Sequence, residues 1–97
     1  MKYFVYVLRS SSAGRHYIGI AADVLSRLRE HNTRSGRWTS RFKPWELIAT
    51  EEYPSRSAAY ARERFLKSGA GISERRRLFA GGAEMVRAED ARLVERP

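Results

Sequence analysis

The chain has 97 residues, of which 42% are hydrophobic and 31% charged, and it contains no cysteine. This composition is typical of a globular protein and argues against wholesale disorder, and the length predicts one small domain. Without cysteine, disulfides and thiolate metal sites are excluded. No apolar run approaches the roughly 20 residues of a membrane span, and the apolar start is too short for a signal peptide. We therefore expect a cytoplasmic protein with no membrane partner.

The charge of the chain is strongly positive. Lys and Arg number 19 against 11 Asp and Glu, which gives a net charge of +8. Such a field attracts polyanions, above all nucleic acid, and predicts binding that weakens with salt. Most of the cations are arginines, whose planar guanidinium suits bidentate phosphate contacts. The alternative, a chain that is simply basic, stays open at this point.

Two short strands are predicted at the start of the chain. Residues 3–8 form a run of aromatic and β-branched residues that is apolar on both alternating faces, which is typical of a central strand. A short turn separates this run from a second strand over residues 16–20, so an antiparallel hairpin is expected. In the second strand Tyr17 shares a face with Gly19. Because glycine has no side chain, it leaves space beside Tyr17 for a ligand or another backbone.

A helix should follow from Val24 to about residue 32 or 34, with Asp23 as its N-cap. Its apolar face is formed by three aliphatic residues: Val24, Leu25 and Leu28. Arg27 and His31 lie one turn apart at the border of that face. A cation and an imidazole close to the end of a strand suggest part of a site, although basic helix borders are often only solvated.

Residues 37–44 interleave basic and aromatic side chains without a helical or strand period. Such a loop suits phosphate contacts and base stacking. We therefore predict five nucleic-acid-binding residues, the last of them on a later helix: Arg37, Trp38, Arg41, Lys43 and Lys67. The alternative is a loop that covers the core with Trp38 and Phe42 buried, and both interpretations can hold together.

The second half of the chain begins with a predicted strand over residues 45–53. Ser55 is then expected to cap a helix over residues 56–68 whose apolar arc consists of Ala58, Ala59, Ala61, Phe65 and Leu66. Glu63 lies at the edge of this arc, one turn before Lys67. A short basic helix follows from Ser73 and ends at Gly81 and Gly82. We predict a domain over residues 1–82 and a C-terminal extension of unknown role over residues 83–97.

Five of these side chains together suit phosphodiester hydrolysis: Tyr6, Tyr17, Arg27, His31 and Glu63. Hydrolysis needs a proton acceptor for water, positive charge for the transition state and help for the leaving oxygen. A phenol can act as the base when nearby cations lower its pKa, and Arg27 offers such a charge. One carboxylate suffices for Mg²⁺, which retains several waters. Singly, each residue also has an ordinary structural explanation, such as a core tyrosine or the helical pair of Glu63 and Lys67.

The order and spacing of these residues resemble those of the GIY-YIG nucleases. The likeness rests on Phe4-Val5-Tyr6, then Tyr17-Ile18-Gly19, and then Arg27, His31 and Glu63. It covers about residues 2 to 80 and is strongest with the small stand-alone bacterial proteins of the UPF0213 type. Phe4 stands where the motif that names the family has glycine, and this departure removes no chemical group.

This resemblance implies an α+β fold, a small three-stranded antiparallel sheet flanked by helices. It further implies hydrolysis of DNA, with branched or damaged DNA as candidate substrates, by one Mg²⁺ or Mn²⁺ ion. Tyr17 would be the base with Tyr6 assisting, Arg27 the catalytic arginine, His31 the helix histidine and Glu63 the metal ligand. Two alternatives are a nucleic-acid-binding module without turnover and an accessory domain that is active only with a partner protein.

Overall fold

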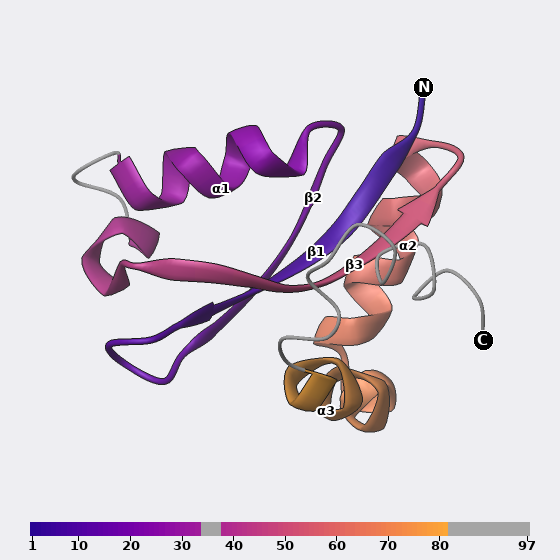
Figure 1. Ribbon diagram of the computed structural model, residues 1–97. Helices are drawn as coiled ribbons and strands as arrows, with labels where there is room; N and C mark the ends of the chain where they lie inside the picture. Colours follow the sequence, from indigo (N-terminus) through magenta and orange to yellow (C-terminus); the bar gives the residue numbers. More distant parts are fainter. Residues whose placement is uncertain (34–37, 82–97) are drawn as a thin grey trace.

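The computed structural model describes residues 1–33 and 38–81 (Figure 1). Arg37 and the predicted extension over residues 83–97 lie outside these ranges. Along the chain the elements are β1 (Tyr3–Ser10), β2 (His16–Ala21), α1 (Val24–Thr33), the 3-10 helix η1 (Thr39–Phe42), β3 (Trp45–Tyr53), α2 (Arg56–Lys67), the 3-10 helix η2 (Gly69–Gly71) and α3 (Ile72–Gly81). The expected order of strands and helices is confirmed.

The sheet has three antiparallel strands in the order β2-β1-β3. The strand that is apolar on both faces is therefore the central one, as predicted. Tyr6 of β1 pairs with Gly19 on β2 and with Thr50 on β3. This register is what brings the two tyrosines of the sequence motif onto one face of the sheet.

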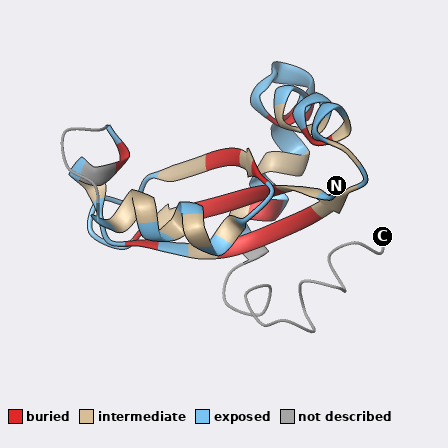
Figure 2. Cartoon of the chain, turned by 90° about the horizontal axis from the view of Figure 1, so that it is seen from above, coloured by how far each residue is buried: buried red, intermediate tan, exposed pale blue. Residues whose placement is uncertain are grey.

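Helices cover both faces of the sheet (Figure 1). On one face, Val5 and Val7 of β1 pack with Ala59 and Leu66 of α2 and with Leu78 of α3. The other face contains a second cluster of buried residues, Tyr6, Leu8, Ala21 and Trp45, against which Val24 and Leu28 of α1 pack. Figure 2 shows that burial is concentrated in the strands, while α1 is coloured only intermediate or exposed.

Side-chain caps fix the starts of both long helices. Asp23 Oδ1 accepts a hydrogen bond of 3.0 Å from the Ser26 amide, and Ser55 Oγ accepts one of 3.2 Å from the Ala58 amide. Both caps are of the residue types that satisfy the free amides of a first turn, and both were predicted. They set where α1 and α2 begin, and so which of their residues reach the sheet.

Three details of the predicted elements are wrong, two on helix faces and one in the loop before β3. Leu25 is 66% exposed, and of the three aliphatic residues only Val24 and Leu28 pack against the buried cluster of the sheet. On α2 the apolar arc is narrower than expected, since Phe65 is 39% exposed and Ala61 is also exposed. The basic and aromatic loop is not without regular structure, because η1 lies within it.

An ion-pair cluster joins α2 to the neighbouring elements. Arg62 Nε donates to Glu51 of β3 at 2.9 Å, and its Nη2 donates to Glu74 of α3 at 2.9 Å. Glu51 is only 8% exposed, so its carboxylate needs this partner. The cluster fixes the rotation of α2 and thereby the place of Glu63, the next residue.

No helix within the described residues is long and apolar enough to cross a membrane.

Candidate active site

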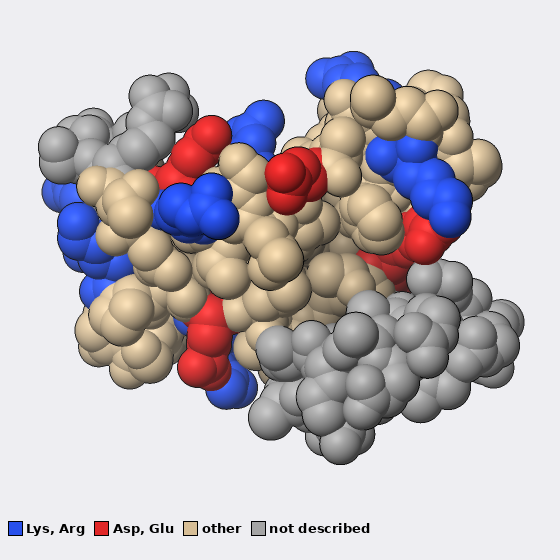
Figure 3. Space-filling model, turned by 45° about the horizontal axis from the view of Figure 1, so that its top comes forward, with Lys and Arg blue, Asp and Glu red and all other residues tan. Residues whose placement is uncertain are grey.

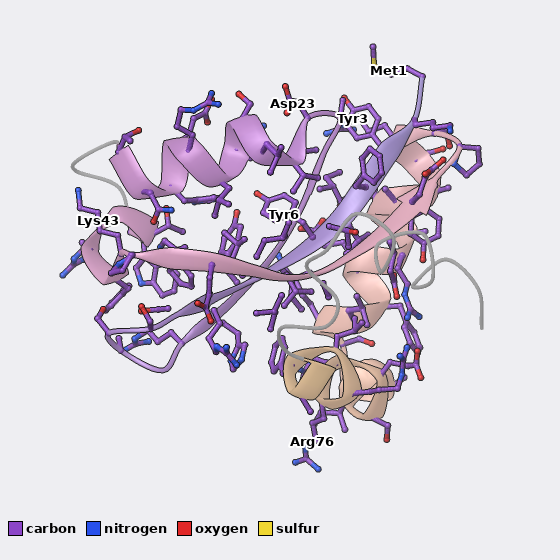
Figure 4. The ribbon with its side chains drawn as sticks, viewed as in Figure 1. Met1, Tyr3, Tyr6, Asp23, Lys43 and Arg76 are labelled. Atoms are coloured by element: carbon purple, nitrogen blue, oxygen red, sulfur yellow. The ribbon has the colours of Figure 1, made fainter. Side chains whose placement is uncertain are left out.

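Tyr6, Tyr17 and His31 come together between the sheet and α1. Tyr6 Oη lies 3.1 Å from His31 Nε2, which is hydrogen-bond distance. The Tyr17 ring is 4.8 Å from the His31 ring and 6.1 Å from the Tyr6 ring, centre to centre. Figure 4 shows Tyr6 projecting from β1 toward α1. Three predicted catalytic side chains, each from a different element, therefore form one cluster.

Gly19 makes room for this cluster. A Cβ on Gly19 would lie 2.7 Å from Tyr6 Oη and 2.8 Å from Tyr6 Cζ, which is closer than real contacts allow. The Tyr6 phenol thus lies directly over the glycine of its cross-strand partner. The open space expected beside Tyr17 for a ligand is wrong: Tyr6 itself occupies it.

His31 is held by contacts that the sequence did not reveal. Its Nδ1 lies 2.8 Å from Thr39 Oγ1, so both ring nitrogens have partners. Thr39 is buried, and its carbonyl accepts a 2.5 Å hydrogen bond from Trp45 Nε1. A histidine bonded at both nitrogens has a fixed ring orientation, and because both partners are hydroxyl groups, each of them can donate to or accept from the ring. Thr39 carries no sequence signal, because it lies in a segment without periodicity.

Asn32 positions the end of α1 against β3. Its side-chain amide donates to the Trp45 carbonyl at 3.1 Å, and its carbonyl oxygen accepts from the Trp45 amide at 2.6 Å. The side chain thus replaces a strand partner at the start of β3. Asparagine is an unfavourable helix former. Its presence in the last turn of α1 is the sequence signal from which a bond between its side chain and the backbone could have been predicted.

The electrostatic surroundings of Tyr6 connect it to the remaining predicted residues. Burial raises the pKa of Tyr6 well above its ordinary value, and the neighbouring Tyr17 and Glu63 act in the same direction, whereas Arg27 opposes them. At neutral pH Tyr6 is therefore a protonated phenol. The charges of Arg27 and Glu63 thus act on the pKa of this phenol in opposite directions.

Arg27 borders a cavity of about 320 Å³, which none of Tyr6, Tyr17, His31 and Glu63 lines. The cavity lies where β1, the end of β2 and the starts of α1 and α2 meet, and Tyr3 and Arg56 also line it. Figure 4 shows Tyr3 and Asp23 at this end of the molecule. Two guanidinium groups from two helices thus border one concave, partly open space.

Glu63 is the residue that the sequence predicts as the metal ligand. Its side chain is 15% exposed, and its Oε2 atom forms an ion pair with Lys67 Nζ at 3.0 Å. The same ammonium group lies 6.0 Å from the centre of the Tyr17 ring, so Lys67 belongs to the site region. Within the described residues, no group of three or more His, Cys, Asp or Glu is placed to hold a metal. Mg²⁺ is usually held by one or two carboxylates together with water and substrate phosphate, rather than by protein ligands alone. A single carboxylate such as Glu63 is therefore compatible with a Mg²⁺ site.

The remaining predicted DNA contacts lie at the η1 end of the molecule. Trp38 is 46% exposed, and Arg41 and Lys43 are exposed, while Phe42 is half-buried and packs against the Tyr6 cluster. Both interpretations of this loop therefore hold in part. Arg37 lies outside the described residues. Figure 3 shows several Lys and Arg side chains along this left-hand edge of the molecule, and further Lys and Arg at the right, with Asp and Glu between them.

Fold and site together define a small α+β protein with a three-stranded sheet. Its candidate site combines phenol, imidazole, guanidinium and carboxylate groups. The model of the GIY-YIG catalytic domain matches residues 2–71, which is most of the chain. The chain therefore belongs to the GIY-YIG nuclease family. The predicted family and fold class are confirmed.

Relatives of two kinds are similar to this chain. A UPF0213 protein of Staphylococcus epidermidis is 37% identical over 68 residues, which cover 69% of this chain and 82% of that protein. The structure-specific endonuclease subunit SLX1 of Meyerozyma guilliermondii is 39% identical over 98 residues, covering 93% of this chain but only 32% of that longer protein. The solution NMR structure of a UPF0213 protein from Bacillus halodurans matches with a TM-score of 0.50 and 26% identity, over 95% of this chain and 94% of that one.

Proposed function

We propose that the chain is an endonuclease that hydrolyses phosphodiester bonds in DNA and depends on one Mg²⁺ or Mn²⁺ ion. The observation that supports this most is the arrangement of Tyr17 and His31 around Tyr6, with the charges of Arg27 and Glu63 acting on the same phenol. Family membership supports a nuclease, and the net charge of +8 supports a polyanionic substrate.

The two tyrosines would have different roles. Tyr6 is buried and protonated, and it serves best as a hydrogen-bond donor and as the link to His31. Tyr17 is half-buried, and it is our candidate for the base that takes the proton of the attacking water. Lys67 lies 6.0 Å from the Tyr17 ring centre, where it can balance negative charge that develops on the phenol.

Arg27 would neutralise the charge that develops on the phosphoryl oxygens in the transition state. Glu63 would hold the metal ion, after Lys67 has released the carboxylate. When bound, the ion supplies Lewis-acid polarisation of the phosphate and stabilises the leaving oxygen. Lys67 is 52% exposed, so its ammonium group can leave Glu63 without burial cost and stay on the Tyr17 side of the site.

Substrate structure and pathway are a further part of the proposal. The SLX1 relative is named as a structure-specific endonuclease subunit, and this supports branched DNA as substrate and a possible role in repair. Because this chain spans only 32% of that relative, dependence on a partner protein is an alternative.

The test is cleavage of plasmid and branched DNA by the purified chain with Mg²⁺, with Mn²⁺ and with chelator. We expect metal-dependent nicking that falls about 10²- to 10³-fold in Arg27→Ala. Glu63→Gln should abolish the metal-dependent cleavage while keeping salt-sensitive DNA binding. Arg64→Ala is the matched control for a lost helical arginine, because Arg64 is exposed on α2 and lies over Tyr60.

Two outcomes would overturn the proposal. Binding without cleavage under any metal, with Glu63→Gln binding as wild type does, would identify a nucleic-acid-binding module. Cleavage that persists in chelator and in both variants would show that the chemistry lies elsewhere.

A further inference from the structure

An aromatic cluster with a basic rim lies at the end of the molecule where η1 meets the β1–β2 hairpin. The Trp38 and Phe42 rings meet edge to face, 4.9 Å apart at an angle of 61°. Arg15 from the hairpin places its guanidinium carbon 4.4 Å from the centre of the Phe42 ring and 5.9 Å from that of Trp38. We call Arg15, Trp38 and Phe42 the stacking platform.

Trp38 is the member of the platform with free surface. Phe42 is half-buried against the Tyr6 cluster and carries Arg15 on its face, whereas Trp38 is 46% exposed. Nothing in the proposed chemistry uses the exposed part of Trp38. An exposed indole face next to a guanidinium group is the surface on which nucleobases stack.

The platform is held rigidly before any ligand arrives. The Phe42 carbonyl accepts a 2.5 Å hydrogen bond from Ser10 Oγ, and the Thr39 carbonyl accepts one of 2.5 Å from Trp45 Nε1. These bonds attach both ends of η1 to the sheet. A surface that is ordered in advance loses little conformational entropy on binding.

Positive charge surrounds the platform. Arg15, Arg41 and Lys43 are all exposed, and Figure 4 shows Lys43 beside η1. The nearby acidic residue Glu46 is already paired with Arg9 at 2.5 Å. The charge therefore suits the backbone of a nucleic-acid strand that lies across the aromatic rings.

A row of aromatic rings connects the platform with the candidate active site. The centre of the Trp45 ring is 6.4 Å from that of Tyr17 and 6.3 Å from that of Trp38. Stacked nucleotides advance about 3.4 Å each along a strand. A base on Trp38 would therefore lie only a few nucleotides from a phosphate next to Tyr17.

We propose that the stacking platform binds an unpaired nucleobase of the DNA substrate and so selects DNA in which a duplex adjoins a single-stranded segment. The faces of bases inside a duplex are covered by their neighbours, so only an unpaired base can lie on Trp38. The proposal rests on the proposed nuclease function for the position of the cleaved bond, but the binding preference stands by itself.

The test compares binding of a blunt duplex with that of the same duplex carrying a single-stranded thymidine flap, by fluorescence anisotropy in chelator so that nothing is cleaved. Wild type should bind the flapped DNA more tightly. Trp38→Ala should lose about tenfold in affinity for the flap and less than twofold for the duplex, and Trp38→Phe should keep most of the preference. Tyr60→Ala is the matched control and should change neither affinity, because Tyr60 is likewise 46% exposed and likewise lies beside an arginine, on α2.

Tryptophan fluorescence gives a second measurement that needs no stable alanine variant. The chain has two tryptophans, and Trp45 is only 3% exposed. A thymidine oligonucleotide should therefore quench wild-type emission and leave that of Trp38→Phe unchanged. Equal affinity of wild type for both DNAs, or equal loss on both in Trp38→Ala, would overturn the proposal. Metal-dependent cleavage with no flap preference would refute the platform alone, whereas flap preference without cleavage under any metal would refute the nuclease function alone.

Discussion

The two faces of the sheet differ in chemistry although one strand, β1, supplies the centre of both. Toward α2 and α3, β1 presents Val5 and Val7 to a purely apolar cluster that buries Ala59, Leu66 and Leu78. Toward α1 it presents Tyr6 and Leu8 to a face that also holds Tyr17, Trp45 and the bonded His31. The first face is closed by helices with fully buried residues, whereas α1 buries none completely.

This difference shows how a small domain separates stability from chemistry. Apolar burial on the α2 and α3 face supplies the free energy of folding, because buried area is its main source. The α1 face can then contain hydroxyl and imidazole groups, which stabilise little and need partners. Substitutions on the α2 and α3 face should therefore lower mainly the free energy of unfolding, whereas those on the α1 face should lower activity more strongly.

The largest effect on stability should come from the apolar face. Leu66→Ala or Leu78→Ala removes a side chain that is 0% exposed and should lower the free energy of unfolding by about 2–5 kcal/mol. The rate of cleavage per folded molecule should stay as in wild type. Chemical denaturation and cleavage assays check both. Leu25→Ala is the control, because Leu25 is 66% exposed and its loss should cost less than about 0.5 kcal/mol. A large loss in Leu25→Ala would contradict the described packing of α1.

Gly19→Ala tests the crowded point of the other face. The new Cβ would lie 2.7 Å from Tyr6 Oη, so the phenol must move away from His31. We expect a loss of about 1–3 kcal/mol in stability together with a loss of most of the cleavage activity. Gly69→Ala is the matched control, because a Cβ there would meet no atom within 4 Å. If Gly19→Ala keeps full activity, Tyr6 need not lie over β2 for catalysis.

Much of this contrast could be predicted from the sequence, because it follows from local patterns. The run over residues 3–8 is apolar in both alternating positions, and that pattern identified the central strand. The cap residues Asp23 and Ser55 marked where the helices begin. Tyr6, Tyr17 and His31 were found because their order and spacing resemble those of a family.

The remaining features depend on how distant segments meet, and periodicity carries no information about that. Leu25 has the spacing of a core residue, but whether it reaches the sheet depends on the tilt of α1. The space beside Gly19 is filled from the neighbouring strand through the register of β1 and β2. Thr39 contacts His31 only because the chain returns through η1 beneath the end of α1.

High pH should reveal the buried tyrosine of the α1 face. Because the pKa of Tyr6 is raised by burial above its ordinary value of 10.0, the unfolded chain releases this proton first as the pH increases. The stabilisation is complete below pH 10 and is lost as the pH rises above it, by up to about 1.4 kcal/mol per pH unit. Tyr6→Phe removes the contribution of this phenol, and Tyr53→Phe should remove a second, separate contribution that extends to about pH 12, where Tyr53 titrates in the folded chain because burial and Glu51 raise its pKa.

Chemical denaturation of wild type and Tyr6→Phe between pH 9 and pH 11 measures this slope. The two proteins should differ by a constant amount below pH 10 and converge above it. Parallel curves over the whole range would show that Tyr6 titrates as an ordinary exposed phenol, and the face it occupies would then be more open than described.

The smallest effect on stability should come from Thr39, whose hydroxyl orients His31 without touching Tyr6 or Tyr17. Thr39→Val keeps the branched shape and the backbone carbonyl that Trp45 bonds, so the free energy of unfolding should fall by only about 1 kcal/mol. Because Nδ1 of His31 then loses its partner and the ring is oriented less precisely, the cleavage rate should fall about tenfold to a hundredfold. Thr39→Ser restores the hydroxyl and should recover most of the rate, which a purely structural role would not require. If Val and Ser variants cleave equally, the orientation of His31 does not depend on Thr39, and the α1 face would tolerate a loosely held imidazole.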